Sequence, residues 1–123
     1  MIPGFDEERP LFLQVATLLE EAILSGAYPE ESQVPSITEL SVSCKINPAT
    51  ALKGVNLLVE QGFLYKKRGL GMFVAGGARE RLAQERKKQF FAGYIEPLLA
   101  EAEKLGLSRE DMMEMIQKGA MRQ

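Results

Sequence analysis

The chain opens with the pattern of an amphipathic helix. Apolar residues recur at three- and four-residue spacing over residues 10–25, which is typical of a helix with one buried face. Pro10 suits the first turn, because its missing N–H would have no partner there. Gly26 follows the last apolar position and fits a C-terminal cap. This pattern predicts a helix over residues 10–25.

Two shorter helices follow, separated by a sharp break. Ser36 and Glu39 have the spacing of a capping box, which predicts a helix over residues 37–44. Asn47 is a good N-cap for a further helix, and Pro48 suits its first position. Two short helices joined by a turn of three or four residues form a helix-turn-helix.

The hydrophobic period changes after Gly62, where the third helix ends. Residues 63–66 and 72–75 predict two strands, and residues 67–71 between them contain two glycines that suit a hairpin turn. Three helices followed by a hairpin form a winged helix. The expected fold class is therefore mainly α with a small β-hairpin.

The rest of the chain returns to a helical period. We expect a winged helix-turn-helix domain over residues 1–75 and a helical dimerisation region over residues 76–123. A helix is predicted over residues 78–105, with a kink at residues 93–97, where a glycine and a proline interrupt it. A last helix is predicted to start at Ser108.

An apolar stripe at helical spacing runs through residues 76–123. Two helices in 48 residues are too few to build a good core. We therefore expect the stripe to pack against a second copy of the chain, although packing on its own winged helix is the alternative. The predicted dimer contacts are Phe91, Tyr94, Ile95, Leu98, Leu99, Ala102, Leu105, Met112, Met113 and Ile116.

Composition limits the chemistry that the chain can perform. Its 123 residues include no histidine and one cysteine, Cys44, which rules out His-dependent triads and His-ligated or Cys-rich metal sites within one chain. We expect no catalytic site, no metal and no cofactor. The lone cysteine fits a reducing cytoplasm, and the sequence shows neither a signal-peptide pattern nor a membrane span.

The net charge of −2 is unlike that of most nucleic-acid-binding domains, which are basic, yet the charge is unevenly distributed. Residues 1–35 carry −6, residues 36–75 carry +3 and residues 76–123 carry +1. The helix-turn-helix and the hairpin therefore form the most basic part of the chain.

The second helix of such a motif enters the DNA major groove with its N-terminus first. Asn47, Ala49, Thr50 and Lys53 lie at or near that end, where polar side chains and exposed N–H groups suit phosphates and base edges. The hairpin tip, residues 66–69, carries three cations. Helix capping alone would also explain Ser36 and Asn47, but the order of the elements favours double-stranded DNA as the partner.

Four segments resemble, in order and spacing, the motifs of GntR-type bacterial transcriptional regulators. They are P-L-F-L-Q-V at residues 10–15, V-P-S with E-L at residues 34–40, E-Q-G-F-L at residues 60–64 and R-G-L-G-M-F-V at residues 68–74. The sequence I-N-P-A-T at residues 46–50 resembles the YtrA-like subfamily. The resemblance implies a homodimeric DNA-binding regulator, often a repressor of neighbouring transporter genes, with a short two-helix dimerisation region.

The resemblance also implies which residues contact a palindromic operator. Thr38 stands where the family usually has an arginine, and Ala49 replaces an asparagine. The candidate contacts are Ser36, Thr38, Asn47, Pro48, Ala49, Thr50 and Lys53 in the helix-turn-helix and Lys66, Lys67, Arg68 and Gly69 in the wing.

The sequence leaves two alternatives to DNA binding. A winged-helix module that docks on a protein partner is the alternative, slightly favoured by Thr38 and by the acidic first helix. An enzyme is disfavoured, since the chain has no nucleophile–base pair and no phosphate-binding loop. Whether the chain binds a small-molecule effector stays an open question, because no set of residues in the sequence indicates a particular ligand.

Overall fold

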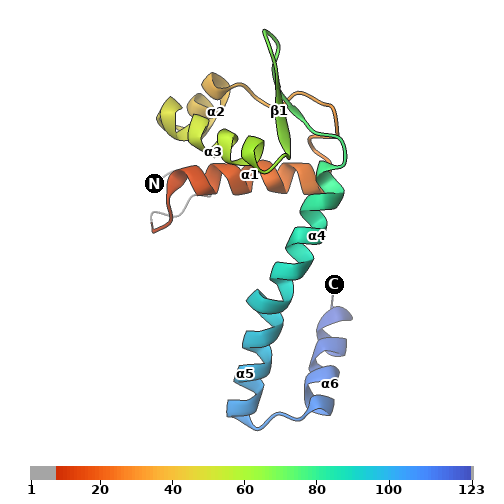
Figure 1. The fold of residues 1–123 in the computed structure, drawn as a ribbon. Coiled ribbons are helices and arrows are strands. Elements are labelled where there is room, and N and C mark those ends of the chain that lie inside the picture. The colour runs from red at the N-terminus through yellow and green to blue at the C-terminus, as the bar shows by residue number, and fades with distance from the viewer. Residues whose placement is uncertain (1–7, 123) are drawn as a thin grey trace. The chain divides into compact units, whose positions relative to one another are not determined.

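The structure, a computed structural model, describes residues 8–122. The first seven residues of the predicted 1–75 domain, with Asp6 and Glu7 of the acidic segment, and Gln123 at the other end lie outside the described residues. The fold is mainly helical with one small hairpin, so the predicted fold class is confirmed (Figure 1). Its elements are α1 (Leu11–Ser25), α2 (Ile37–Cys44), α3 (Pro48–Glu60), β1 (Leu64–Lys67), β2 (Gly71–Val74), α4 (Ala78–Phe90), the π-helical turn η1 (Phe91–Ile95), α5 (Glu96–Leu105) and α6 (Arg109–Ala120).

The chain divides into two compact units, the first ending at Gln84 and the second beginning at Glu85. The first unit therefore takes in residues 78–84 of α4, beyond the boundary expected at residues 75 and 76. Ala78 and Leu82 explain the extension, because both are buried in the core of the first unit.

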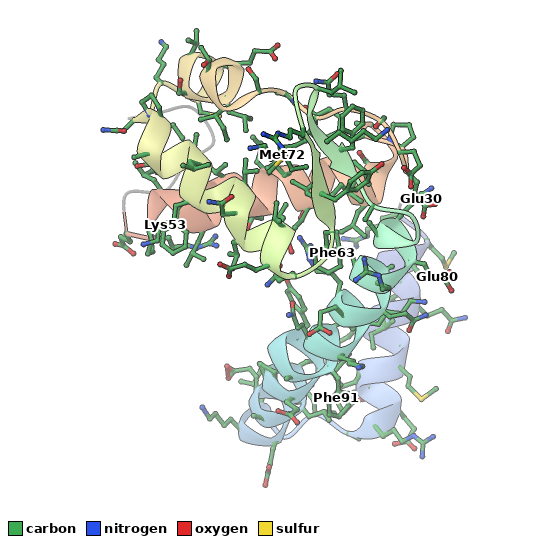
Figure 2. All side chains as sticks on the ribbon, turned by 45° about the horizontal axis from the view of Figure 1, so that its top comes forward. Glu30, Lys53, Phe63, Met72, Glu80 and Phe91 are labelled. Atoms are coloured by element: carbon green, nitrogen blue, oxygen red, sulfur yellow. The ribbon has the colours of Figure 1, made fainter. Side chains whose placement is uncertain are left out.

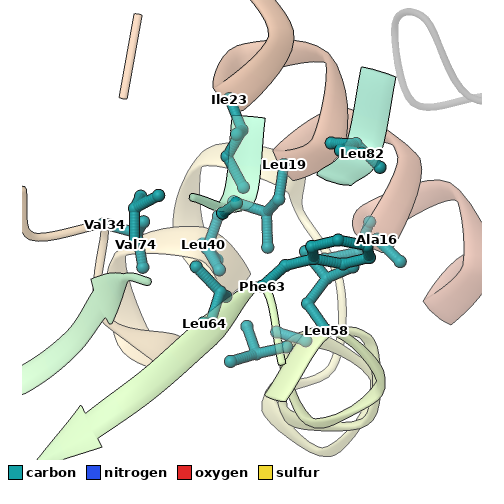
Figure 3. Packing of buried hydrophobic residues seen from close by; sticks show 14 of the residues in the cluster. Ala16, Leu19, Ile23, Val34, Leu40, Leu58, Phe63, Leu64, Val74 and Leu82 are labelled. Carbon is teal, nitrogen blue, oxygen red and sulfur yellow. The ribbon is translucent and has the colours of Figure 1, made fainter. Parts of the chain in front are cut away.

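Every element of the first unit contributes to one hydrophobic core. Leu19 of α1, Leu40 of α2, Leu58 of α3, Leu64 of β1 and Leu82 of α4 meet there (Figure 3). All five side chains are at most 3% exposed. Burying each of them contributes about 1.5–3 kcal/mol by apolar transfer, so this unit holds itself together.

Helices α1 and α3 cross closely at Gly54. A Cβ atom there would lie 2.7 Å from the carbonyl oxygen of Phe12 and 2.9 Å from the Cβ of Val15, inside van der Waals distance. Glycine is the residue that lets the two backbones approach this closely. The crossing sets how α3 is seated on the core.

The hairpin is flanked by a third extended segment. Strands β1 and β2 are antiparallel, with Tyr65 opposite Phe73, and they begin and end within one residue of the predicted strands. The N–H of Val34 donates to the Met72 carbonyl and the N–H of Val74 donates to the Ser32 carbonyl, both at 2.9 Å. Residues 31–34 thus support β2 along its length and hold the hairpin at its base.

The second unit consists of the end of α4, the π turn and the helices α5 and α6. The predicted interruption falls on η1, where the N–H of Glu96 bonds to the carbonyl of Phe91, five residues back. This wider turn directly precedes α5, whose second residue, Pro97, has no N–H to continue the helical hydrogen bonding. Helix α6 begins with a capping box between Ser108 and Asp111, as the sequence predicted.

Within residues 8–122, no helix is both long enough and apolar enough to span a bilayer.

Candidate nucleic-acid interface

The two helices of the helix-turn-helix start at side-chain caps. The N–H of Glu39 donates to Ser36 Oγ, and the N–H of Ser36 donates to Glu39 Oε1, both at 3.0 Å. These hydrogen bonds from Ser36 hold the pKa of the Glu39 carboxyl below its usual value. The N–H of Ala49 donates to Asn47 Oδ1 at 2.8 Å, which leaves the amide nitrogen of Asn47 as a donor. Both residues therefore build the motif whether or not they also touch DNA.

The outer face of α3 is apolar up to Leu52 and polar beyond it. Its exposed residues are Ala49, Leu52, Lys53, Asn56 and Glu60, together with Pro48 at the helix start. With Phe12 and Leu57, the same face lines a hollow of about 340 Å³ between α1 and α3. The side chain of Leu52 is 45% exposed although it is large and aliphatic. This face carries one cation and one carboxylate.

The cation of α3 is held by an aromatic ring. Lys53 projects from α3 (Figure 2). Its Nζ lies 4.1 Å from the centre of the Phe12 ring, a cation–π contact with the first turn of α1. At an exposed site such a contact contributes about 0.5–1 kcal/mol. The ammonium group is therefore drawn toward α1, while it stays exposed and able to reach a phosphate.

The lysines of the wing point to opposite faces of the hairpin. Lys66 is on the face that also carries the buried Leu64, because alternate residues of a strand share a face. Lys67 is on the other face, where its Nζ lies 4.3 Å from the Phe73 ring centre and 5.9 Å from that of Tyr65. The sequence pattern places Lys67 in the turn and so does not distinguish these two cations, whereas β1 extends to Lys67.

The turn of the wing is fixed from outside by Gln33. Gln33 Nε2 donates to the Leu70 carbonyl at 2.6 Å. Gly69 has φ +80° and Gly71 has φ +126°, values that favour glycine. A Cβ atom at Gly71 would lie 2.6 Å from Gln33 Nε2. Arg68 and Gly69 are thus presented on a supported loop that is exposed to solvent.

Glu31 provides a second support at the base of the wing. The Tyr65 hydroxyl donates to the Glu31 carboxylate, and this hydrogen bond raises the pKa of the phenol. Gln33 and Glu31 were both missed in the sequence analysis. Each acts across more than 30 residues of chain, and no local pattern signals such a contact.

The structure brings the candidate DNA contacts together on the first unit. Thr50 is half-buried at the start of α3, and all the others are exposed. The exposed residues are Ser36, Thr38, Asn47, Pro48, Ala49, Lys53, Lys66, Lys67, Arg68 and Gly69. Their contacts with DNA remain predictions.

Two arginines of α4 help to hold the first unit together. Arg79 Nε donates to the Leu24 carbonyl at the end of α1, at 3.1 Å. Arg81 donates to the Gly62 carbonyl at the end of α3, and its guanidinium lies 5.1 Å from the Phe63 ring centre. Cations at helix C-termini satisfy orphan carbonyls and complement the helix dipole. These arginines attach the start of α4 to the rest of the first unit.

The second unit exposes most of the residues predicted to form a dimer. Five of them, Leu98, Ala102, Leu105, Met112 and Ile116, line an apolar groove of about 330 Å³ between α5 and α6. Ala102 is buried in that groove, and Ile95 and Met112 are half-buried. The exposed predicted residues are Phe91, Tyr94, Leu98, Leu99, Leu105, Met113 and Ile116.

No protein-family model matches the chain. A solved structure of a GntR-family protein from Bacteroides thetaiotaomicron does match it, at 32% identity over 91% of this chain and 97% of that one, with a TM-score of 0.77. The chain belongs to the GntR family. Its members are transcriptional regulators, so the expectation that the chain is not an enzyme is confirmed.

The GntR resemblance extends beyond the winged helix. The repressor YtrA of Bacillus subtilis is 26% identical over 89% of this chain and 83% of its own length, so the resemblance to the YtrA-like subfamily is confirmed. The DNA-binding domain of AraR, solved in complex with the operator ORX1, is 29% identical over 61% of this chain and 92% of that one, with a TM-score of 0.54.

Proposed function

We propose that this GntR-family chain is a homodimeric repressor that binds a palindromic operator in the cytoplasm. The observation that carries the proposal is the placement of an exposed α3 N-terminus and a supported basic wing on one compact unit. In a helix-turn-helix, the second helix lies in the major groove while other elements contact the backbone. Here α3 would read bases, and Lys66 and Arg68 would contact phosphates.

The relatives support DNA as the partner. The first unit shares its fold with a domain solved on operator DNA, and a relative that aligns over most of the chain is named a repressor. The charge of +3 over residues 36–75 supports the same conclusion, since phosphate neutralisation provides much of the affinity of such domains.

The proposed dimer rests on the second unit. Leu105 and Ile116 are 65% and 58% exposed there, although apolar side chains of this size usually pack away from water. The groove between α5 and α6 is lined almost wholly by carbon. A second copy of the same helices would cover this surface, and the resulting two-fold symmetry would match a palindromic operator.

Fluorescence anisotropy with labelled duplexes tests DNA binding. We expect a preference for a site selected from a genomic pool over random duplex. The logarithm of affinity should fall with the logarithm of salt concentration, by about 0.9 per phosphate contact. Arg68→Ala should weaken binding and flatten this slope by about one contact, whereas Lys118→Ala removes the same charge from the second unit and should leave the slope unchanged. Equal affinity for selected and random duplex, or a flat salt dependence, would contradict the proposal.

Light scattering tests the dimer. The wild-type chain should have twice the mass of one chain at micromolar concentration. Ile116→Glu places a carboxylate in the apolar groove and should yield a monomer. Leu18→Glu, at an exposed leucine of α1, is the matched control and should remain dimeric. A monomeric wild-type chain would rule out the proposed assembly.

One observation favours the alternative, docking on a protein partner. The outer face of α3 presents the exposed aliphatic side chain of Leu52 and a single cation. A mobility-shift assay with genomic fragments distinguishes the two functions. Shifted fragments support the regulator, and the absence of any shift at low salt supports the protein-interaction module.

A further inference from the structure

The outer face of α3 is poorly suited to recognise guanine. Guanine is read in the major groove chiefly by arginine or lysine, through its O6 and N7 acceptors. Helix α3 contains no arginine, and its single lysine, Lys53, has its ammonium over the Phe12 ring at 4.1 Å. The single cation of α3 is therefore drawn toward α1 by this weak contact, and the helix has no second cation to offer to guanine.

The same face is well suited to a methyl group. Ala49 and Leu52 lie three residues apart in the N-terminal half of α3, both exposed, and neither can donate or accept a hydrogen bond from its side chain. They form the apolar end of the hollow of about 340 Å³, which is also lined by Phe12, Leu57 and the polar residues Lys53, Asn56 and Glu60. Among the four bases, only thymine presents a methyl group in the major groove.

We infer that Leu52, together with Ala49, reads thymine through its C5 methyl group. This inference rests on the proposed function, since it requires α3 to enter the major groove. Ala49 and Leu52 are separated by about 4.5 Å along the helix axis, from a rise of 1.5 Å per residue. Their Cβ atoms are about 5–6 Å apart, as for any helical pair at this spacing, so at a stacking distance of 3.4 Å the two side chains cover one or two neighbouring base pairs. Each half-site should therefore hold thymine at one or two adjacent positions facing the start of α3.

Deoxyuridine tests this inference on the unaltered protein, because it differs from thymidine only in lacking the C5 methyl. A site is first selected from a random pool, and each thymine is then replaced singly by deoxyuridine. We expect affinity to fall about three- to fivefold at one or two positions in each half-site, the effect of one buried methylene-sized group, and to stay constant at the others.

Two variants assign the effect to Leu52. Leu52→Ala should bind the thymine site more weakly and should not distinguish deoxyuridine at the position that Leu52 reads. Leu18→Ala shortens a leucine with the same 45% exposure on α1 and should keep the full deoxyuridine effect. Leu52→Arg, taken through a second selection, should exchange the preference at that position from thymine to guanine.

The outcomes separate this inference from the proposed function. Specific binding that is insensitive to every deoxyuridine, or selected half-sites without thymine, would overturn the role of Leu52 and leave the DNA-binding regulator standing. An unchanged base preference in Leu52→Arg would do the same. Failure to prefer any sequence over random duplex would instead overturn the proposed function.

Discussion

The two units of this chain place their apolar side chains in opposite ways. In the first unit, Leu19 and Leu58 are almost fully buried in a core to which four helices and a hairpin contribute. In the second unit, Leu105 and Ile116 are more than half exposed, and Ala102 is the one buried residue among those described. The first unit can hide its apolar surface within itself, whereas a pair of helices cannot.

The difference does not come from how the helices begin. Helix α2 of the first unit and helix α6 of the second both start with a capping box, Ser36–Glu39 and Ser108–Asp111. Local sequence therefore specifies helices equally well in both units. What separates them is long-range packing, which supplies most of the stability of helices in proteins.

The largest contrast should come from shortening one apolar side chain in each unit. Leu58→Ala opens a cavity in the core and should lower the free energy of unfolding of the first unit by about 2–5 kcal/mol. Ile116→Ala removes atoms that are 58% exposed within one chain and should leave the first unit unchanged, with any loss confined to self-association. Urea titration followed by residue-resolved amide exchange measures both effects.

The result that would contradict this prediction is specific. If Ile116→Ala lowered the protection of amides in α1 and α3 as much as Leu58→Ala does, the two units would not be independent in stability. If Leu58→Ala had no effect, the core would be misassigned.

Part of this architecture is readable from the sequence. The caps at Ser36, Asn47 and Ser108 were predicted and are confirmed, because a cap depends on residues within one turn. The strands were predicted within one residue at each end, because two closely spaced glycines mark the turn between them. The interruption before Pro97 was predicted too, although its form, a π turn, was not.

The contacts that sequence analysis missed all join residues far apart in the chain. Arg81 of α4 donates to the Gly62 carbonyl at the end of α3, 19 residues back along the chain. Lys53, predicted as a DNA contact, also packs on Phe12 from another helix. A charged side chain looks alike in sequence whether it faces solvent, a ring or a carbonyl. For this reason residues 36–75 could be identified as basic, but their cations could not be given separate roles. The DNA contacts and the dimer contacts stay predictions.

Adding a methyl group to one glycine in each unit should change stability by smaller amounts, with a loss in the first unit and a gain in the second. Gly54→Ala would place Cβ against the Phe12 carbonyl and the Val15 side chain, so we expect a loss of about 1–3 kcal/mol although alanine favours helix. Gly119→Ala in α6 meets nothing within 4 Å and should gain up to about 1 kcal/mol of local helix stability.

Thermal unfolding of the two variants and amide exchange in α3 and α6 measure the pair. A stabilised Gly54→Ala variant would show that α1 and α3 can separate at no cost. The close crossing would then not be what seats α3.

The smallest effect concerns the two capping-box carboxyls, one in each unit, whose contribution to stability should change only at acidic pH. Hydrogen bonds from the backbone and side chain of Ser36 lower the pKa of Glu39, and those of Ser108 lower the pKa of Asp111. A carboxyl with a lowered folded-state pKa contributes stability above its unfolded-state pKa and loses that contribution as pH falls through the folded value.

Carboxyl ¹³C shifts followed by NMR over the acidic range should show both groups titrating below their ordinary values. Ser36→Ala removes the hydroxyl but keeps the N–H whose hydrogen bond lowers the pKa of Glu39 most, so it should return this pKa only part of the way to its ordinary value and leave Asp111 unchanged. Ser108→Ala should shift Asp111 part of the way in the same manner and leave Glu39 unchanged. If either substitution shifted the pKa of both carboxyls, the two caps would be coupled. The start of each helix would then not be specified by its local sequence alone, contrary to the comparison of the two units.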